Sequence, residues 1–202
     1  PGFSLRMESP VADFVEESGR VAGVRLAGGE EIRARLTIAA DGRSSIVRSM
    51  LPLEELGAPM DVFWFRIAKK ETEQGGLRGN FERGRLLVMI DRGDYWQCAF
   101  LIPKGAAEAI QARGIGAIRE QVAAAAPGLD LAELDEISDL HLLSVKLDRL
   151  MAWHRPGLLA IGDAAHAMSP IGGIGINLAI QDAVAAANYL AAPLAAGENV
   201  DP

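Results

Sequence analysis

Residues Gly157 to Leu190 read GLLAIGDAAHAMSPIGGIGINLAIQDAVAAANYL, and the fold follows from this stretch. The apolar run Leu158 to Ile161 opens after Pro156 and closes at a Gly-Asp pair, a pattern typical of a buried strand in a parallel sheet. A glycine-rich loop comes next, and beyond Gly175 the apolar residues recur at helical spacing. The stretch therefore predicts a strand, a loop and a helix, with a core-facing helical stripe made of Ile176, Ile180, Ala183, Val184, Ala187 and Leu190.

The loop of this stretch has the features of a ligand site. Gly172, Gly173 and Gly175 carry no Cβ that would hold a ligand away from the backbone. The first N–H groups of the helix add hydrogen-bond donors and partial positive charge, which suit an anion or a flat ring with carbonyl edges. Asp163 follows the predicted strand at its carboxyl end, where ligands bind in open α/β sheets, and its carboxylate can accept from sugar-type hydroxyls. The glycine pattern alone also allows a plain turn before a core helix.

A second stretch, AADGRSSIVR at residues 39–48, predicts a strand that ends at an Asp-Gly turn before a short helix. Ser44 or Ser45 is placed to cap that helix. Spacing alone leaves this stretch as an ordinary structural element, with Arg48 as a surface arginine.

Together the two stretches resemble the FAD motifs of flavin-dependent monooxygenases of the para-hydroxybenzoate hydroxylase and ubiquinone-pathway hydroxylase type. The resemblance rests on D-G-x-x-S-x-x-R at 41–48 and on G-D-A-A-H at 162–166 with Pro170, Gly173, Gly175, Asn177 and Asp182. It implies that Asp163 hydrogen-bonds the ribityl chain of FAD, that Asp41 contacts the cofactor and that Arg48 is a positioning residue. The full set that it assigns to the cofactor is Asp41, Gly42, Arg48, Gly162, Asp163, Pro170, Gly172, Gly173, Ile174, Gly175, Ile176 and Asn177.

Two differences from the family limit what carries over from the resemblance. Position 174, often Gln in these enzymes, is Ile here. The resemblance therefore carries over the backbone role of this position but not a side-chain contact with the cofactor. The family also opens with a strand, G-x-G-x-x-G and a helix that hold the ADP half of FAD, and nothing before Asp41 supplies that unit. With Pro1 in first place, we expect the chain to lack its native beginning. No side chain stands out as an acid or base, so we predict no catalytic residue.

The rest of the chain predicts mostly strands. A β-meander is expected over Val11 to Ala40, its third strand running to the end of that range. Further strands are expected over Asp61 to Lys104 and a helix with an interruption at Gly114 over Ala106 to Ala126. His154 and Arg155 are predicted as turn residues, and the aromatic residues at strand positions are predicted to lie in the core: Trp64, Phe65, Trp96 and Phe100.

The fold class that follows is a mixed α/β (α+β) protein. We expect a Rossmann-like FAD-binding domain, made of residues 1–55 with its β-meander and DG motif and residues 146–202 with its GD motif and helix. It is interleaved with a β-sheet substrate domain over residues 56–145.

Composition excludes several classes of protein. The net charge of −7 and the pI near 5.0 argue against nucleic-acid binding. A single cysteine, Cys98, excludes an internal disulfide framework, and we expect it to be a buried strand residue in a cytoplasmic protein. No apolar window suits a transmembrane segment, and the histidines lack the spacing of metal ligands.

The resemblance implies an oxidoreductase, an FAD-dependent hydroxylase in which NAD(P)H is the transient reductant and O₂ supplies one oxygen atom to an organic substrate. An aromatic small molecule is the favoured substrate. Two alternatives stay open: another FAD enzyme of the same fold, such as a halogenase, an epoxidase or a prenyl reductase, and a non-catalytic fragment.

Overall fold

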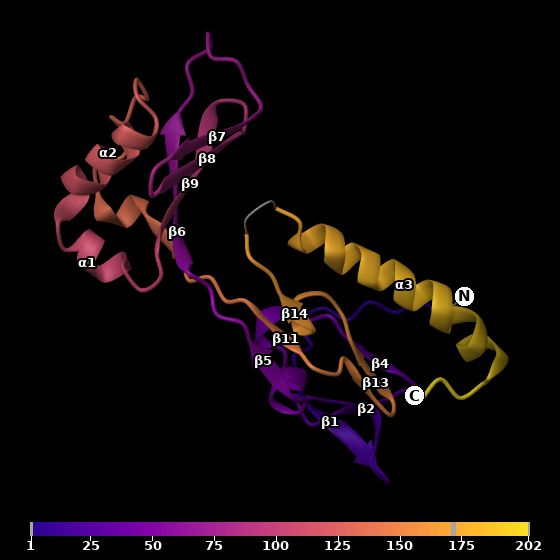
Figure 1. Cartoon of the computed structure of the whole chain (residues 1–202). Helices are drawn as coiled ribbons and strands as arrows, with labels where there is room; N and C mark the ends of the chain where they lie inside the picture. The colour runs from indigo at the N-terminus through magenta and orange to yellow at the C-terminus, as the bar shows by residue number, and fades with distance from the viewer. Residues whose placement is uncertain (1, 171–172, 202) are drawn as a thin grey trace. The chain divides into compact units, whose positions relative to one another are not determined.

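The computed structural model describes residues 2–170 and 173–201, and the chain divides into two compact units (Figure 1). The first unit combines Pro1–Gly57 with Lys146–Pro202, and the second is Ala58–Val145. In Figure 1 the indigo strands and the yellow helix belong to the first unit. The two ends of the sequence thus build one unit, and the middle builds the other.

The first unit opens with an antiparallel sheet of order β1-β2-β3, made of β1 (Val11–Glu17), β2 (Arg20–Leu26) and β3 (Glu31–Arg33). Its first turn places Ser18 and Gly19 at positive φ, 49° and 80°, as two-residue turns between antiparallel strands require. The start of the predicted meander is confirmed.

The predicted third strand of that meander is wrong, because it is two strands in two sheets. β3 ends at Arg33, and β4 (Thr37–Ala39) pairs in parallel with β13 (Leu158–Ala160). Alternation of apolar and polar residues has the same period of two on both sides of the break, so it carries no information about which partner each half pairs with.

The parallel pair confirms the buried strand predicted before Gly162. Leu158 is 1% exposed and Ala160 is fully buried, and β13 also pairs antiparallel with β12 (His154–Arg155). The prediction of His154 and Arg155 as turn residues is therefore wrong. Pro156 and Gly157 make the turn instead, and the backbone N–H of Ala160 donates to the carbonyl of Trp153 at 2.7 Å.

A third sheet of the first unit has the order β14-β11-β5, from β14 (His166–Ala167), β11 (Asp148–Leu150) and β5 (Leu53–Glu55). Three single-turn 3₁₀ helices connect the strands: η1 (Gly42–Ser44), η2 (Ile46–Ser49) and η4 (Gly162–Ala164). The hydroxyl of Ser45 accepts from the N–H of Val47 and so caps η2, one of the two caps predicted. One hydrophobic cluster joins the sheets of this unit with η2 and η4, and it consists of Phe14, Val21, Ala39, Val47, Leu150, Leu158, Ala160, Ala164 and Ala165.

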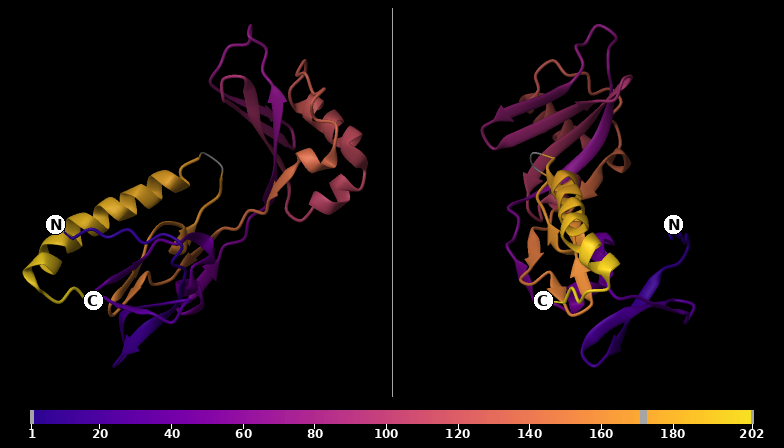
Figure 2. Two further views of the ribbon diagram at one scale, coloured as in Figure 1. Left: turned by 180° about the vertical axis from the view of Figure 1, so that it is seen from behind. Right: turned by 90° about the vertical axis from the view of Figure 1, so that its right-hand side faces the viewer.

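The helix predicted after Gly175 is α3 (Gly175–Ala196), and Figure 2 shows it in yellow beside the orange strands of its unit. The predicted core-facing stripe is wrong: Ile176, Ile180 and Val184 are 70%, 55% and 54% exposed. The helix is apolar around most of its circumference, since Asp182 is its one charged residue. Spacing therefore cannot tell which face packs against the unit.

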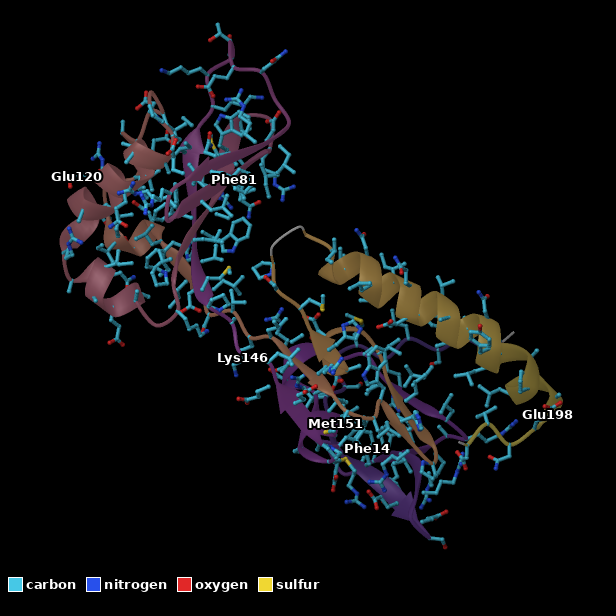
Figure 3. All side chains as sticks on the ribbon, in the orientation of Figure 1. Phe14, Phe81, Glu120, Lys146, Met151 and Glu198 are labelled. Atoms are coloured by element: carbon cyan, nitrogen blue, oxygen red, sulfur yellow. The ribbon has the colours of Figure 1, made fainter. Side chains whose placement is uncertain are left out.

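The second unit is a five-stranded antiparallel sheet of order β10-β6-β9-β8-β7 with two helices. Its elements are β6 (Met60–Ala68), β7 (Leu77–Glu82), β8 (Arg85–Asp91), β9 (Tyr95–Pro103), α1 (Ala107–Gln111), α2 (Gly114–Ala125), η3 (Ile137–Asp139) and β10 (His141–Leu143). The predicted strands and the interrupted helix are confirmed. On edge strand β7, the exposed side chain of Phe81 is labelled in Figure 3. Its ring lies close to Gly79, because a Cβ at that glycine would be 2.7 Å from Cε2 of the ring.

Aromatic residues fill the core of the second unit, as predicted. Trp96 is fully buried and Phe65 and Phe100 are each 2% exposed, whereas Trp64 is partly buried on the other face of the sheet. Cys98 is fully buried in β9, where burial raises the pKa of its thiol to about 12. The burial of Cys98 in β9 confirms the predicted buried strand residue, and a protonated thiol is a poor nucleophile.

Across the described part of the chain, no helix is long and apolar enough to cross a membrane. The same residues contain no cluster of His, Cys, Asp or Glu able to hold a metal ion.

Candidate cofactor site

A cavity of about 530 Å³ opens in the first unit where η1, the loop after β13 and the start of α3 meet. It brings together six of the residues assigned to the cofactor from the sequence: Gly42, Gly162, Asp163, Pro170, Gly175 and Ile176. Apolar side chains complete much of the wall, from Ile161, Met168, Ala179 and Ala183. The carboxylate of Asp163 thus lies beside a largely apolar surface.

The other assigned residues that the structure describes do not line this cavity. Asp41 directly precedes η1, Ile174 precedes α3 and Asn177 lies in its first turn. Gly173 has φ of +62°, which favours glycine, and its N–H donates to the carbonyl of Pro170 at 3.1 Å. Gly172 lies outside the described residues.

Arg43 is a cavity residue that sequence reasoning missed. Its Nε donates to Oδ2 of Asp163 at 3.0 Å, and its Nη2 donates to the carbonyl of Met168 at 3.0 Å. The side chains of Arg43 and Asp163 are 35% and 39% exposed, so solvent and a ligand can reach both. One guanidinium therefore links the start and the end of the loop that walls the cavity.

Arg48 also holds this loop, through hydrogen bonds to two of its backbone carbonyls. Its side chain is 10% exposed, forms an ion pair with Asp148 on β11, and donates to the carbonyls of Asp163 and Ala164 at 3.0 and 3.4 Å. Arg48 is thus no surface arginine, and the structure fits the positioning role expected for it. No sequence pattern identified Asp148 as the partner of Arg48, because the residues around it are those of an ordinary short strand.

Asp182 fastens the loop to α3. Its Oδ2 accepts from the N–H of Gly162 at 2.9 Å and lies 2.7 Å from Nε2 of His166, whose ring lies 4.8 Å from the ring of Trp153. Gly162 has φ of +58°, and a Cβ there would lie 3.0 Å from Cβ of Ala179 on the helix. Close approach of the loop to α3 therefore depends on glycine at this position.

The N-terminus of α3 faces the cavity through Gly175 and Ile176. No side chain among the described residues caps this helix, and its first recorded backbone bond runs from the N–H of Leu178 to the carbonyl of Ile174. Among the described residues, the N–H groups of the first turn have no acceptor in this helix, and the 22-residue helix adds partial positive charge at this end. The cavity thus offers one carboxylate, one guanidinium and a helix N-terminus to a ligand that has both hydroxyls and a polar ring edge.

Comparison with known proteins gives a family match over almost the whole chain: residues 1–200 match the family model described as FAD binding domain. A relative from Streptomyces rimosus, 6-methylpretetramide 4-monooxygenase, is 36% identical over 197 residues, which are 92% of this chain and 46% of the relative. Protoasukamycin 4-monooxygenase from Streptomyces nodosus subsp. asukaensis is 26% identical over 95% of this chain and 48% of its own length. The chain spans about half the length of these curated relatives.

Solved structures share the fold. PqsL from Pseudomonas aeruginosa, described as a probable FAD-dependent monooxygenase, superposes with a TM-score of 0.74 at 24% identity, over 93% of this chain and 54% of that protein. BrvH, a flavin-dependent halogenase from Brevundimonas sp. BAL3, superposes with a TM-score of 0.69 at 13% identity, over 91% of this chain and 37% of the halogenase. The mixed α/β fold with several sheets is therefore the fold of these flavoproteins, over about half of the PqsL structure.

Proposed function

The chain belongs to the FAD binding domain family, and on that premise we propose that the cavity of its first unit takes the flavin end of FAD in a monooxygenase that hydroxylates an aromatic substrate with NAD(P)H and O₂. The observation that carries this proposal is the carboxylate of Asp163, in η4 just after β13, in one cavity with the N-terminus of α3.

The residues present fit such a cofactor. The second carboxylate oxygen of Asp163, Oδ1, has no recorded partner among the described residues and is placed to accept from a ribityl hydroxyl. The N–H groups at the start of α3 suit the polar edge of a flavin ring. There is room beside Gly175, because among the described residues a Cβ there would meet Cβ of Met168 alone, at an ordinary 3.8 Å.

When bound, FAD supplies the redox chemistry. The chain's own residues bind and orient it: Arg48 and Asp182 hold the loop that presents Asp163, and the α3 N-terminus favours negative charge on the ring. Ile161, Met168 and Ile176 give one side of the cavity an apolar wall. No residue of the cavity needs to act as an acid or base in this role.

The names of the relatives support the reaction class. Two curated relatives are 4-monooxygenases, and the 36% identity to the first exceeds the 13% to the halogenase BrvH. A crystal structure of PqsL contains 2-aminobenzoylacetate, an aromatic acid. Halogenation stays the rival reaction, because the halogenases share the fold.

The test uses protein expressed from the complete reading frame that contains this chain. Asp163→Ala removes a charged hydrogen bond of about 1.5–3 kcal/mol, so FAD affinity measured by flavin fluorescence should fall about ten- to a hundredfold. Asp135→Ala, at an exposed position of the second unit, is the matched control. Unchanged affinity in a folded Asp163→Ala variant would refute the site.

The reaction is tested separately with the wild-type protein. NAD(P)H oxidation is followed across a panel of aromatic compounds in the presence and absence of halide, and products are identified by mass spectrometry. A product that gains one oxygen atom supports the proposal, and a halogenated product would replace it.

A further inference from the structure

We propose that Arg43 and Asp163 act together as a paired donor and acceptor that reads the hydroxyls of the bound ligand's sugar-alcohol chain. This inference rests on the proposed function, because it concerns the same cavity and the same cofactor. It adds Arg43 as a ligand-binding residue of that site.

The geometry places the two side chains as one unit. Nε of Arg43 donates to Oδ2 of Asp163 at 3.0 Å, and both side chains line the cavity. The pairing uses one oxygen of the carboxylate and one edge of the guanidinium. Within the described part of the chain, Nη1 of Arg43 and Oδ1 of Asp163 take part in no hydrogen bond, so the pair offers a ligand one donor and one acceptor there.

The chemistry of this pair matches hydroxyl groups better than ions. A hydroxyl donates one hydrogen bond and accepts others, whereas a guanidinium only donates and an ionised carboxylate only accepts. An Asp163 without Arg43 would leave an uncompensated negative charge at the cavity wall, which favours a cation. The ion pair cancels that charge, so the wall suits a neutral polyol.

Arg43 cannot be replaced by another cation in this arrangement. Its planar guanidinium reaches Asp163 with Nε and the carbonyl of Met168 with Nη2 at the same time, both at 3.0 Å. A lysine carries one ammonium on a flexible stem and lacks this fixed fork. We therefore expect that geometry, and not charge alone, determines the contribution of position 43.

The test measures affinity for FAD and for FAD analogues that each lack one ribityl hydroxyl, again with protein from the complete reading frame. Arg43→Gln should weaken FAD binding about tenfold, and Arg43→Lys should restore little of the loss. For the analogue that lacks the hydroxyl contacted by Arg43, the difference between wild type and Arg43→Gln should nearly vanish. Arg83→Gln, at an exposed turn residue, is the control and should bind every compound like wild type.

Several outcomes overturn the inference. If Arg43→Gln lowers the affinity for every analogue by the same factor, Arg43 only holds the loop in place. If Arg43→Gln binds FAD with wild-type affinity, Arg43 has no role in binding. If the wild-type protein binds no FAD, the proposed function fails and this inference fails with it. If Asp163→Ala weakens FAD binding but Arg43→Gln does not, only the inference fails.

Discussion

Oδ2 of Asp182 in α3 lies 2.7 Å from Nε2 of His166, and the same oxygen accepts from the N–H of Gly162. One residue of the C-terminal helix thus fixes two points of the loop that walls the candidate cofactor site. At the other end of the helix, the guanidinium of Arg35 donates to the carbonyls of Leu194 and Glu198. Because no described residue of α3 is fully buried, these polar contacts carry much of its attachment.

The first prediction follows from this attachment. Asp182→Ala should lower the free energy of unfolding by about 2–3 kcal/mol, because two partly buried donors lose their acceptor. Alanine favours helix, so the substitution itself would otherwise stabilise α3. Urea denaturation measures the change, with Asp135→Ala as an exposed control. Equal stability of the two variants would mean that Asp182 does not hold the helix.

The buried ion pair gives the second prediction. Arg48→Met leaves the carboxylate of Asp148, 8% exposed, without its counter-ion, and should cost about 3–5 kcal/mol of stability. The double variant Arg48→Met/Asp148→Leu removes both charges and should recover much of that loss in urea denaturation. It should not recover FAD affinity, because the carbonyls of Asp163 and Ala164 still lack their donor. Full recovery of affinity would contradict the positioning role of Arg48.

The local elements of the site could be predicted from the sequence because each has a local cause. The strand at Leu158, the loop and the start of the helix at Gly175 follow from an apolar run, a glycine cluster and helical spacing within one stretch. The contacts between elements had no such signal. Arg43 and Asp163 lie 120 positions apart, and only the folded chain brings them together.

The exposed stripe on α3 and the break between β3 and β4 share another physical cause. Periodicity shows which residues of an element lie on one face, and it does not show what covers that face or which strand pairs with it. Ile180 is exposed despite its helical spacing, and Ile38 in β4 is 45% exposed despite its alternation. Both features depend on neighbours that are distant in sequence.

A glycine substitution gives the third prediction. Gly162→Ala should destabilise the protein by about 1–2 kcal/mol, because an L-residue is strained at φ of +58° and its Cβ would lie 3.0 Å from Cβ of Ala179. Gly116→Ala in α2 is the matched control: no atom lies within 4 Å of its added Cβ, and alanine should stabilise the helix by up to about 1 kcal/mol. Thermal unfolding of both variants measures the contrast, and a Gly162→Ala variant as stable as wild type would contradict it.

The fourth prediction concerns Asp61, a carboxylate of the second unit that is 3% exposed. Burial raises its pKa, but hydrogen bonds from the N–H groups of Gly105 and Val145 and from Lys104 outweigh burial, and the pKa lies below its ordinary value. The ionised group therefore stabilises the fold above the unfolded pKa of about 3.9, and that contribution is lost as the pH falls through the folded pKa.

Asp61→Asn should therefore lower stability at pH 7 by about 2–3 kcal/mol, and less as the medium becomes acidic. Urea denaturation at several pH values from neutral to strongly acidic measures the difference between wild type and variant. Asp135→Asn, an exposed carboxylate in the same unit, should show little difference at any pH. A difference for Asp61→Asn that does not shrink with falling pH would contradict the lowered pKa.

The last prediction concerns the exposed apolar face of α3 when residues 1–202 are produced alone. Ile176, Ile180 and Val184 are four residues apart in turn, so they lie on one face, and each is more than half exposed. Exposed apolar patches of this kind promote association. We expect the chain to self-associate with rising concentration in sedimentation velocity, and Ile180→Lys/Val184→Lys to reduce this association. Gln181→Lys/Asn188→Lys adds the same charge at exposed polar positions of the helix and should reduce it less. A wild-type chain that stays monomeric, or equal effects of the two double variants, would show that this face does not drive association.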